Sequence, residues 1–390
     1  MHKGSEDDFV NDEMVAAVKR YEQMLDEATR YYFDVHEFEV IFDHYFSQKR
    51  YNRAKEVLNL GKAQHPGALA LVLKEAQILV EKGKAREALA KIALVESIDR
   101  TNETLFLLKG SAYLLLDDYD TAQKYYEKAV DLTEEPEDWV LNIAYTFERL
   151  GLLERSIHFL KRYLEDNPDQ EDILWELAVF YEQSGNDELA LETYRKFLDL
   201  NPFSDAGWYN IGVILNQIEK FEQAIEAFDY VLAINPDFHS ALFNKGNTLA
   251  NLDRHEEAIQ TYSEFLLTDE NHPITLCYIG ESYEKLKNFT MAYQYYRKAR
   301  LADPSFAEPW YGLASLMLEQ DNPYEALYYI RKAIQLKESN PDYLFLLGKV
   351  NLKLDFFEDA LKAFQEVLVL DPDDEEAQLM IESLKADNRE

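Results

Sequence analysis

The chain contains little of what disulfide-bonded or membrane-embedded proteins require. Its 390 residues include one cysteine, Cys277, so no disulfide can form within the chain. No run of about 18 apolar residues occurs, and the amino-terminal residues MHKGSEDDFV lack the apolar core of a signal peptide. These absences predict a protein without a membrane span that resides in the reducing cytoplasm.

Positive charge is also scarce. The sequence has 40 lysines and arginines against 74 aspartates and glutamates, which gives a net charge of −34. Such a chain is repelled by nucleic-acid backbones and by anionic membrane surfaces, so neither is expected as a partner. The acidity keeps a large surface soluble, and it also favours basic protein partners; composition leaves both interpretations open.

Sequence motifs for catalysis, metals and cofactors are missing as well. The chain has no P-loop, no G-x-G-x-x-G, no H-E-x-x-H and no C-x2-C. His36 and His44 are spaced too far apart along one predicted helix to share a metal. Carboxylates are numerous, but in so acidic a chain close pairs arise by chance. We therefore expect no catalytic residue, no metal site, no cofactor and no enzymatic activity.

The chain does contain a repeated unit, seen most clearly in residues 205–238, DAGWYNIGVILNQIEKFEQAIEAFDYVLAINPDF. Residues spaced i, i+3, i+4 and i+7 share one face of a predicted first helix: Trp208, Ile211, Gly212 and Leu215. Ala224, Phe228 and Val231 do the same on a second helix, which ends before Pro236. The apolar stripe is wider than one helical hairpin can bury, so neighbouring copies are needed to cover it.

Ten copies follow one another in steps of 34 residues without insertion or deletion. They span residues 35–68, 69–102, 103–136, 137–170, 171–204, 205–238, 239–272, 273–306, 307–340 and 341–374. The eighth place is Gly or Ala in nine copies, the exception being Phe42. The twentieth place is Ala in nine copies and Ser156 in the other, and the twenty-fourth is always large and apolar.

This order of residues resembles the tetratricopeptide repeat, a helix–turn–helix unit of about 34 residues. The resemblance implies an all-α fold, a right-handed superhelical α-solenoid of helix–turn–helix repeats. It also implies that the first helix of each repeat lines a concave groove and the second helix lies on the convex back.

The segments on either side of the repeats are predicted to cover the two ends of the array. In residues 1–34, the first ten are predicted to be disordered, and helical spacing from Met14 to Tyr32 predicts a capping helix. Residues 375–390 are predicted to form a solvating helix and a tail. In the first repeat, the aromatic residues around Phe42 are either a contact site or core.

Side-chain amides stand at places that face the groove in this family. One is in the fourth repeat and the others gather in the sixth and seventh: Asn142, Asn210, Asn216, Gln217, Asn244, Asn247 and Asn251. Amides both donate and accept hydrogen bonds, so a row of them can pair with the backbone of an extended peptide. The alternative is that asparagine is simply common at these places of the family.

Aromatic side chains form a stripe along the same predicted surface. Its members are Trp175, Tyr209, Phe243 and Tyr311, and Tyr278 joins them in the candidate groove site. Exposed aromatic residues often anchor interfaces. Aromatic residues are also frequent at the fifth place of the family, which explains part of the pattern without a ligand.

We therefore hypothesise a non-catalytic scaffold or adaptor that binds a protein segment, extended and basic, in its concave groove. The early first helices lack the basic residues that family members use to grip acidic tails, which disfavours that kind of ligand. One alternative is a structural subunit of a larger complex that uses its convex face and ends. Another is a regulator of an enzyme in trans. The sequence leaves the partner and the oligomeric state open.

Overall fold

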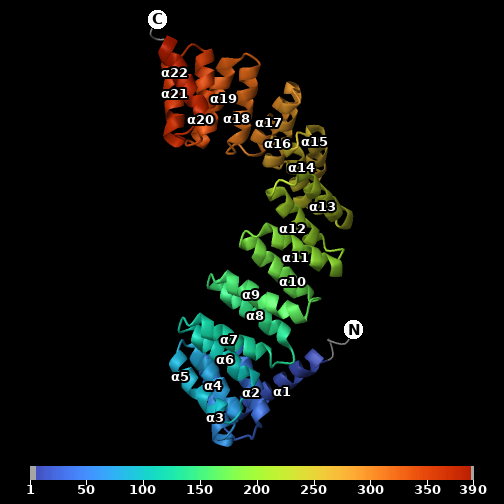
Figure 1. The fold of residues 1–390 in the computed structure, drawn as a ribbon, viewed down its shortest axis with the longest axis vertical. Helices are drawn as coiled ribbons and strands as arrows, with labels where there is room; N and C mark the ends of the chain where they lie inside the picture. Colours follow the sequence, from blue (N-terminus) through green and yellow to red (C-terminus); the bar gives the residue numbers. More distant parts are fainter. Residues whose placement is uncertain (1–5, 388–390) are drawn as a thin grey trace. The chain divides into compact units, whose positions relative to one another are not determined.

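The computed structural model describes residues 6–387 of the chain and the side chains of residues 14–385. Over this range the chain forms 22 α-helices and no strand, so the fold is an all-α solenoid of helical hairpins (Figure 1). Residue contacts divide the chain into two units, residues 1–173 and 174–390. Helix α10 (Glu171–Gln183) crosses the boundary, and each unit is described by itself.

The first unit begins with one helix and continues as four hairpins. Its helices are α1 (Glu6–Asp26), α2 (Val35–Ser47), α3 (Tyr51–Gln64), α4 (Leu69–Glu81), α5 (Ala85–Glu96), α6 (Glu103–Leu114), α7 (Tyr119–Val130), α8 (Pro136–Arg149) and α9 (Leu153–Asp166). The two helices of each hairpin pack against each other most extensively, and the second helix then packs against the first helix of the next hairpin.

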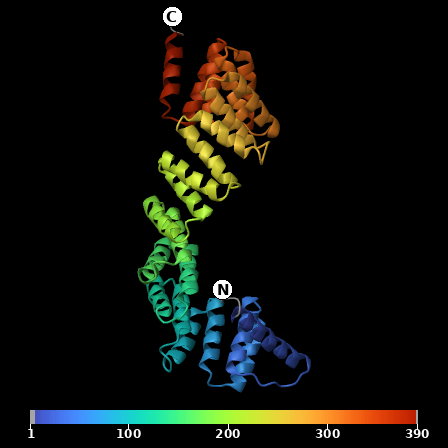
Figure 2. The same cartoon turned by 90° about the vertical axis from the view of Figure 1, so that its right-hand side faces the viewer.

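The second unit continues the same arrangement from α10 onward. Its remaining helices are α11 (Asp187–Leu200), α12 (Asp205–Gln217), α13 (Phe221–Ile234), α14 (His239–Asn251), α15 (His255–Phe265), α16 (Pro273–Lys285), α17 (Phe289–Ala302), α18 (Glu308–Glu319), α19 (Pro323–Leu336), α20 (Pro341–Lys353), α21 (Phe357–Leu370) and α22 (Glu375–Asp387). Paired helices such as α20 and α21 lie side by side in both views (Figures 1 and 2).

The tight turn inside each hairpin has the same backbone conformation throughout. One residue there adopts a positive φ, for example +73° at Gly151 and +57° at Asp253, and these residues recur at the fifteenth place of every 34-residue step. A residue in this left-handed region reverses the chain between two antiparallel helices. Glycine adopts it without strain, and the aspartates are among the residues that tolerate it best.

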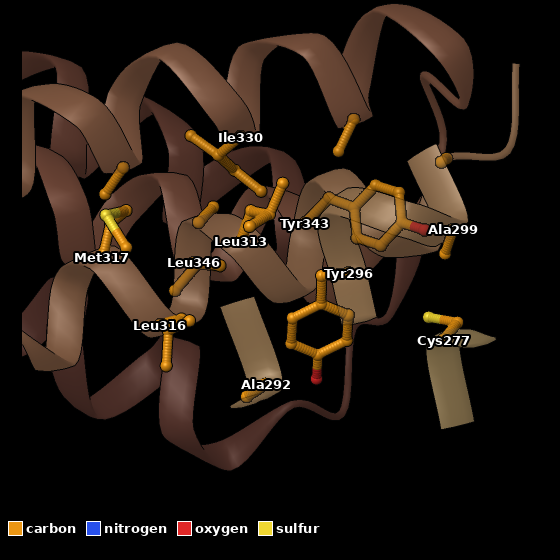
Figure 3. Packing of buried hydrophobic residues seen from close by; sticks show 14 of the residues in the cluster. Cys277, Ala292, Tyr296, Ala299, Leu313, Leu316, Met317, Ile330, Tyr343 and Leu346 are labelled. Carbon is orange, nitrogen blue, oxygen red and sulfur yellow. The ribbon is translucent and has the colours of Figure 1, made fainter. Parts of the chain in front are cut away.

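The small eighth place and the large twenty-fourth place meet in the core of each hairpin. A Cβ atom built on Gly246 would lie 2.4 Å from the Tyr262 ring, and one on Gly280 would lie 2.7 Å from the Tyr296 ring. Tyr296 belongs to a buried cluster with Leu313 and Ile330 (Figure 3). Glycine at Gly246 and Gly280 therefore leaves room for the opposing ring, whereas the fifth repeat accommodates Ala178 opposite Tyr194.

The first repeat solves the same packing problem differently. Phe42 is fully buried at its eighth place and stacks on Phe46 with ring centres 5.3 Å apart. The small residue is instead Gly61, where an added Cβ would lie 3.0 Å from Leu71 and 3.1 Å from the Phe38 ring. The buried aromatic residues of this repeat are thus core, and the contact-site interpretation is not needed for them.

The amino-terminal segment differs from the predicted boundaries. The predicted disordered start covers residues 1–10, of which 1–5 lie outside the described residues and 6–10 belong to α1. The predicted helix up to Tyr32 is too long, because α1 ends at Asp26. The following segment instead binds the end of α3: Phe33 N–H donates to Gln64 Oε1 at 3.1 Å, and Phe33 itself is fully buried.

At the other end, α22 covers the last hairpin. Ala377, Ile381 and Leu384 are buried on its inner face, and the residues between them are exposed except for the half-buried Met380. Within the described part of the chain, no helix has both the length and the apolar character needed to cross a membrane.

Candidate functional site

The surface formed by the first helices of the second unit is the predicted groove, and it is called the groove here. Consecutive first helices contact one another directly, as α12 does α14, α16 does α18, and α18 does α20. Among the described residues, consecutive second helices are not in comparably close contact. Helices that approach more closely on one side of a stack make that side concave, so the first helices line the inner surface.

Two neighbouring pockets open between these first helices. The pocket between α14 and α16 has a volume of about 480 Å³ and is called the amide pocket here; its walls include Asn216, Asn247, Asn251, His255, Tyr278 and Glu281. The pocket between α16 and α18 has a volume of about 440 Å³ and is called the carboxylate pocket; its walls include Glu281, Glu284, Tyr296, Tyr311, Ser315 and Glu319. Glu281 and Lys285 contribute to both pockets.

The tyrosine at the twenty-fourth place closes the base of each pocket. Tyr262 lines the amide pocket and donates its hydroxyl hydrogen to Asn247 Oδ1 at 2.7 Å. Tyr296 lines the carboxylate pocket and donates to Glu284 Oε2 at 2.6 Å. The glycines opposite these rings let the hydroxyl groups reach through the hairpin from the second helix to the groove.

Most of the predicted asparagines, Asn251 excepted, are already hydrogen-bonded within the protein. Asn210 Nδ2 donates to the Tyr194 hydroxyl at 2.9 Å, and Asn244 Nδ2 donates to the Tyr209 hydroxyl at 3.0 Å. Asn216 Oδ1 accepts from Thr248 Oγ1 at 2.8 Å. These amides are therefore oriented by the protein itself, and only part of their hydrogen-bonding capacity remains for a ligand.

The predicted groove residues do not all come together. Asn142 lies in the first unit on α8, where Nδ2 donates to the Asp138 carbonyl at 2.6 Å, and the other eleven lie in the second unit. Of these, Asn216, Asn247, Asn251 and Tyr278 line the amide pocket, and Tyr311 lines the carboxylate pocket. Gln217 is exposed at the end of α12.

The aromatic stripe packs against other aromatic rings, within one repeat at Trp175 and Tyr209 and between repeats at Phe243 and Tyr311. Trp175 packs edge-on against Phe197 at 5.2 Å, and Tyr209 packs against Phe238 at 4.9 Å between ring centres. Phe243 stacks with Tyr278 at 5.8 Å, and Tyr311 stacks with Tyr343 at 5.0 Å. The predicted stripe residues and Tyr278 are half-buried, so each supports the fold while presenting part of its surface to the groove.

Two carboxyl groups of the carboxylate pocket, those of Glu284 and Glu281, have raised pKa values. Burial is the largest cause that raises the pKa of Glu284, and the nearby Glu319 adds to it. Desolvation by the groove walls, with the charges of Glu284 and Glu308, raises the pKa of Glu281 to about 7. The Glu281 side chain nevertheless has an exposed surface, so water screens it and keeps the energetic consequence of this shift small.

Two features of the site were missed by sequence reasoning. The carboxylates Glu281, Glu284 and Glu319 were not singled out, although glutamates at corresponding places of adjacent repeats are visible in the sequence. His255 was also missed; it begins α15, is nine-tenths buried and has no partner for Nδ1 in the described part of the chain. No group of side chains suited to a metal ion occurs among the described residues.

Comparison with protein families identifies the repeats. Models described as "Tetratricopeptide repeat" match residues 104–136, 141–205, 206–238 and 227–260. A model described as "Anaphase-promoting complex, cyclosome, subunit 3" matches residues 288–367. No curated protein matches the chain. Together with the observed hairpins, these matches show that the chain is a tetratricopeptide-repeat protein.

One solved structure supports the fold, and two others resemble part of the chain. A tetratricopeptide repeat protein from Parabacteroides merdae is 18% identical, with a TM-score of 0.51, and the match covers 64% of this chain and 98% of that one. PilW, a type IV pilus biogenesis factor, is 23% identical over 54% of this chain and 98% of its own, with a TM-score of 0.48. YrrB, "a TPR protein with an unusual peptide-binding site", is 19% identical, with a TM-score of 0.41, and the match covers 47% of this chain and 95% of that one.

The fold and the repeats support a general role. Tetratricopeptide-repeat proteins are generally non-catalytic scaffolds for protein–protein interactions, and this chain has the architecture of such a scaffold.

Proposed function

We propose that this protein is a non-catalytic scaffold or adaptor that binds an extended protein segment in the groove of its second unit. The observation that supports this proposal is the pair of adjacent pockets on the first helices, joined by Glu281 and Lys285. A segment lying across α14, α16 and α18 would meet both pockets in succession.

The amide pocket has the chemistry to hold a peptide backbone. The oxygen of Asn247 accepts a hydrogen bond from the Tyr262 hydroxyl, which leaves its amide N–H group to donate elsewhere. Asn216 Oδ1 lies 2.8 Å from Thr248 Oγ1, whose single hydrogen is shared with the Asn244 carbonyl, also at 2.8 Å. The carbonyl groups of an extended segment are the natural acceptors for such donors, whatever its side chains. Because the protein itself orients these amides, little side-chain entropy is lost when a segment binds.

The finer features of this proposal rest on composition. The partner is a protein rather than a nucleic acid because the chain carries a net charge of −34, and the same charge favours a basic segment. We propose the cytoplasm as the location because the chain has a single cysteine.

The test uses peptides displayed from a random library of extended 12-residue sequences and selected on the purified protein. Selected peptides are then titrated against a groove variant, Gln217→Ala with Asn251→Ala. Both side chains are exposed and have no hydrogen bond to another described residue, so their removal leaves the fold intact. Each hydrogen bond lost to the peptide costs roughly 0.5–1.5 kcal/mol, and the double variant should weaken binding about tenfold.

The matched control lies on the second helices. Gln223 on α13 and Gln260 on α15 are exposed, and Gln223→Ala with Gln260→Ala should leave the affinity unchanged. If the control pair abolishes binding and the groove pair does not, the protein binds through its other face and the groove proposal is wrong.

One observation favours the alternative of a structural subunit that binds through its second helices. Tyr324 and Tyr328 on α19 are 75% and 55% exposed, and Tyr328 lies 6.4 Å from Trp310 between ring centres. Exposed aromatic residues of this kind are typical of protein interfaces. The control pair of the display experiment, extended to Tyr324→Ala, decides between the two faces.

A further inference from the structure

The carboxylate pocket contains a half-buried glutamate, Glu284, that has no close ion pair with a lysine or arginine among the described residues. Glu284 is half-buried and accepts hydrogen bonds from two neutral donors, the Tyr296 hydroxyl at 2.6 Å and Ser315 Oγ at 3.0 Å. In the described part of the chain, none of Glu281, Glu284 and Glu319 forms an ion pair with a lysine or arginine, although sixteen lysine or arginine ion pairs occur elsewhere.

A carboxylate withdrawn from water without a cation is unfavourable. Buried charges in proteins are normally paired, because desolvation is costly and a neutral hydrogen bond recovers only part of it. Glu281 and Glu284 are three residues apart on α16, so they share one face of the helix and repel each other. A cation placed between them would relieve both the desolvation and the repulsion.

The protein shows elsewhere what fills such a site. In the first unit, Lys109 of α6 is only 8% exposed, and its Nζ lies 2.7 Å from Glu96 Oε2, 3.3 Å from the Tyr125 hydroxyl and 4.5 Å from the centre of the Tyr125 ring. A glutamate and a tyrosine thus hold a nearly buried ammonium group. The carboxylate pocket has the same components, glutamates and tyrosines, without the lysine.

The lysines near the pocket do not take that place. Lys285 and Lys287 line the pocket, but both are exposed and neither forms an ion pair within the described residues. The charge of Lys285 lowers the pKa of both Glu281 and Glu284, but it does so without an ion-pair contact. The space enclosed by Glu281, Glu284 and Tyr311, part of a pocket of about 440 Å³, stays open to a side chain from outside.

The neighbouring amide pocket independently contains an unpaired group. His255, nine-tenths buried in its wall, has Nε2 at 3.5 Å from Asp253 Oδ1, while Nδ1 has no partner among the described residues. Buried polar atoms are rarely left unpaired in native structures. Each pocket therefore contains a polar group that lacks a partner among the described residues: Glu284 lacks a close cation, and His255 Nδ1 lacks a hydrogen bond.

We propose that the bound segment carries a lysine or arginine whose charged head enters the carboxylate pocket between Glu281 and Glu284, with its aliphatic stem along Tyr311. This inference rests on the proposed function and specifies the partner. The partner is a basic protein segment, and the pocket recognises the positive charge of one of its side chains. The backbone contacts in the amide pocket then supply affinity, and the carboxylate pocket supplies selectivity for a basic residue.

The experiment is the same peptide display, carried out on the wild-type protein and on Glu281→Gln with Glu284→Gln. Glutamine keeps the volume of glutamate, and its oxygen can still accept from the Tyr296 hydroxyl, so the pocket keeps its shape. The matched control is Glu222→Gln with Glu226→Gln on α13, where both glutamates are exposed on a second helix. Thermal melting of all three proteins confirms that each is folded.

Peptides selected on the wild type and on the control should share a lysine or arginine at one position, and those selected on the pocket variant should not. Replacing that residue by alanine should weaken binding to the wild type about tenfold or more, and should change binding to the pocket variant by less than threefold.

Two outcomes separate the levels of the proposal. If binding of the selected peptides depends on Gln217 and Asn251 but the peptides share no basic residue, the basic pocket is refuted while the groove proposal stands. The same holds if replacing the shared basic residue by alanine weakens binding equally to the wild type and to the pocket variant. If no peptide depends on Gln217 and Asn251, the proposed function itself is refuted.

Discussion

Gly246 tests how the hairpin core determines its own sequence. In the seventh repeat, a Cβ atom on Gly246 would lie 2.4 Å from Tyr262 Cε1 and 2.6 Å from Cδ1, well inside van der Waals contact. Tyr262 is 1% exposed, and its hydroxyl is held by Asn247 at 2.7 Å, so the ring has little freedom to move away. The substitution Gly246→Ala should therefore overpack the hairpin.

The expected magnitude follows from two opposing effects. Overpacking a well-filled core costs typically 1–3 kcal/mol, and alanine recovers roughly 0.5–1 kcal/mol because it favours the helix over glycine. With a clash this close, the steric effect should dominate, and Gly246→Ala should lower the free energy of unfolding by about 1–2 kcal/mol. Tyr262→Ile alone should also destabilise, by about 2–3 kcal/mol, because it leaves unfilled space.

The other repeats indicate which combination restores the packing. Where the eighth place is alanine, the twenty-fourth is aliphatic in three repeats: Ala76 with Ile92, Ala144 with Leu160, and Ala314 with Ile330. Where it is glycine, the opposing residue is always aromatic. The double variant Gly246→Ala with Tyr262→Ile recreates the natural pair of the second and ninth repeats, so it should lose less stability than the two single changes added together.

The assay is urea denaturation of the four proteins, with hydrogen exchange to locate the effect. The coupling energy should lie between about 0.5 and 3 kcal/mol, and the loss of protection should remain within the seventh repeat and its neighbours, since contacts in a solenoid are local. A strictly additive double variant, or a single variant as stable as the wild type, would refute this account of the glycine.

Three further predictions concern charge. Lys109→Leu should be neutral or stabilising in urea denaturation, because a buried ion pair can often be replaced by an apolar residue without loss of stability. Glu96→Ala should instead lower the free energy of unfolding by about 1–3 kcal/mol, because it leaves the buried ammonium group of Lys109 unpaired. Equal effects of the two substitutions would contradict this reasoning. Arg155→Ala with Arg162→Ala removes the contacts from α9 to Asp120 of α7 and to Asp131, which directly follows α7. The double variant should reduce hydrogen-exchange protection of α7 by about 1 kcal/mol in low salt. An effect that persists in 1 M salt would argue against an electrostatic origin. The raised pKa of Glu281 stabilises the folded state below its ordinary value of 4.5, and this contribution is lost as the pH rises toward about 7. Between pH 4.5 and pH 8 the urea midpoint of the wild type should therefore fall more than that of Glu281→Gln, and parallel profiles would show that the carboxyl group is freely solvated.

The repeat architecture could be predicted from the sequence because it depends on periodic contacts. A residue such as Ala224 or Phe228 meets the same neighbours in every copy, so each copy independently reports the same packing rule. The family resemblance then indicated which places line the inner surface, and Asn251, Tyr278 and Tyr311 do line the two pockets. Spacing was less informative at the amino terminus, where one segment docks on α3 without any periodic pattern.

Only the tertiary structure decided which polar groups of the groove are already paired. Asn210 bonds Tyr194 on the preceding hairpin, and Asn244 bonds Tyr209 of the preceding repeat, although both asparagines look free in the sequence. In the same way, composition states a net charge of −34 but not that Glu284 lies without a cation between Tyr296 and Ser315. A repeat pattern indicates which residues face the groove. A hydrogen bond or an ion pair instead depends on the distance between two side-chain atoms of different helices, to within a few tenths of an ångström. That distance is set only when the helices pack.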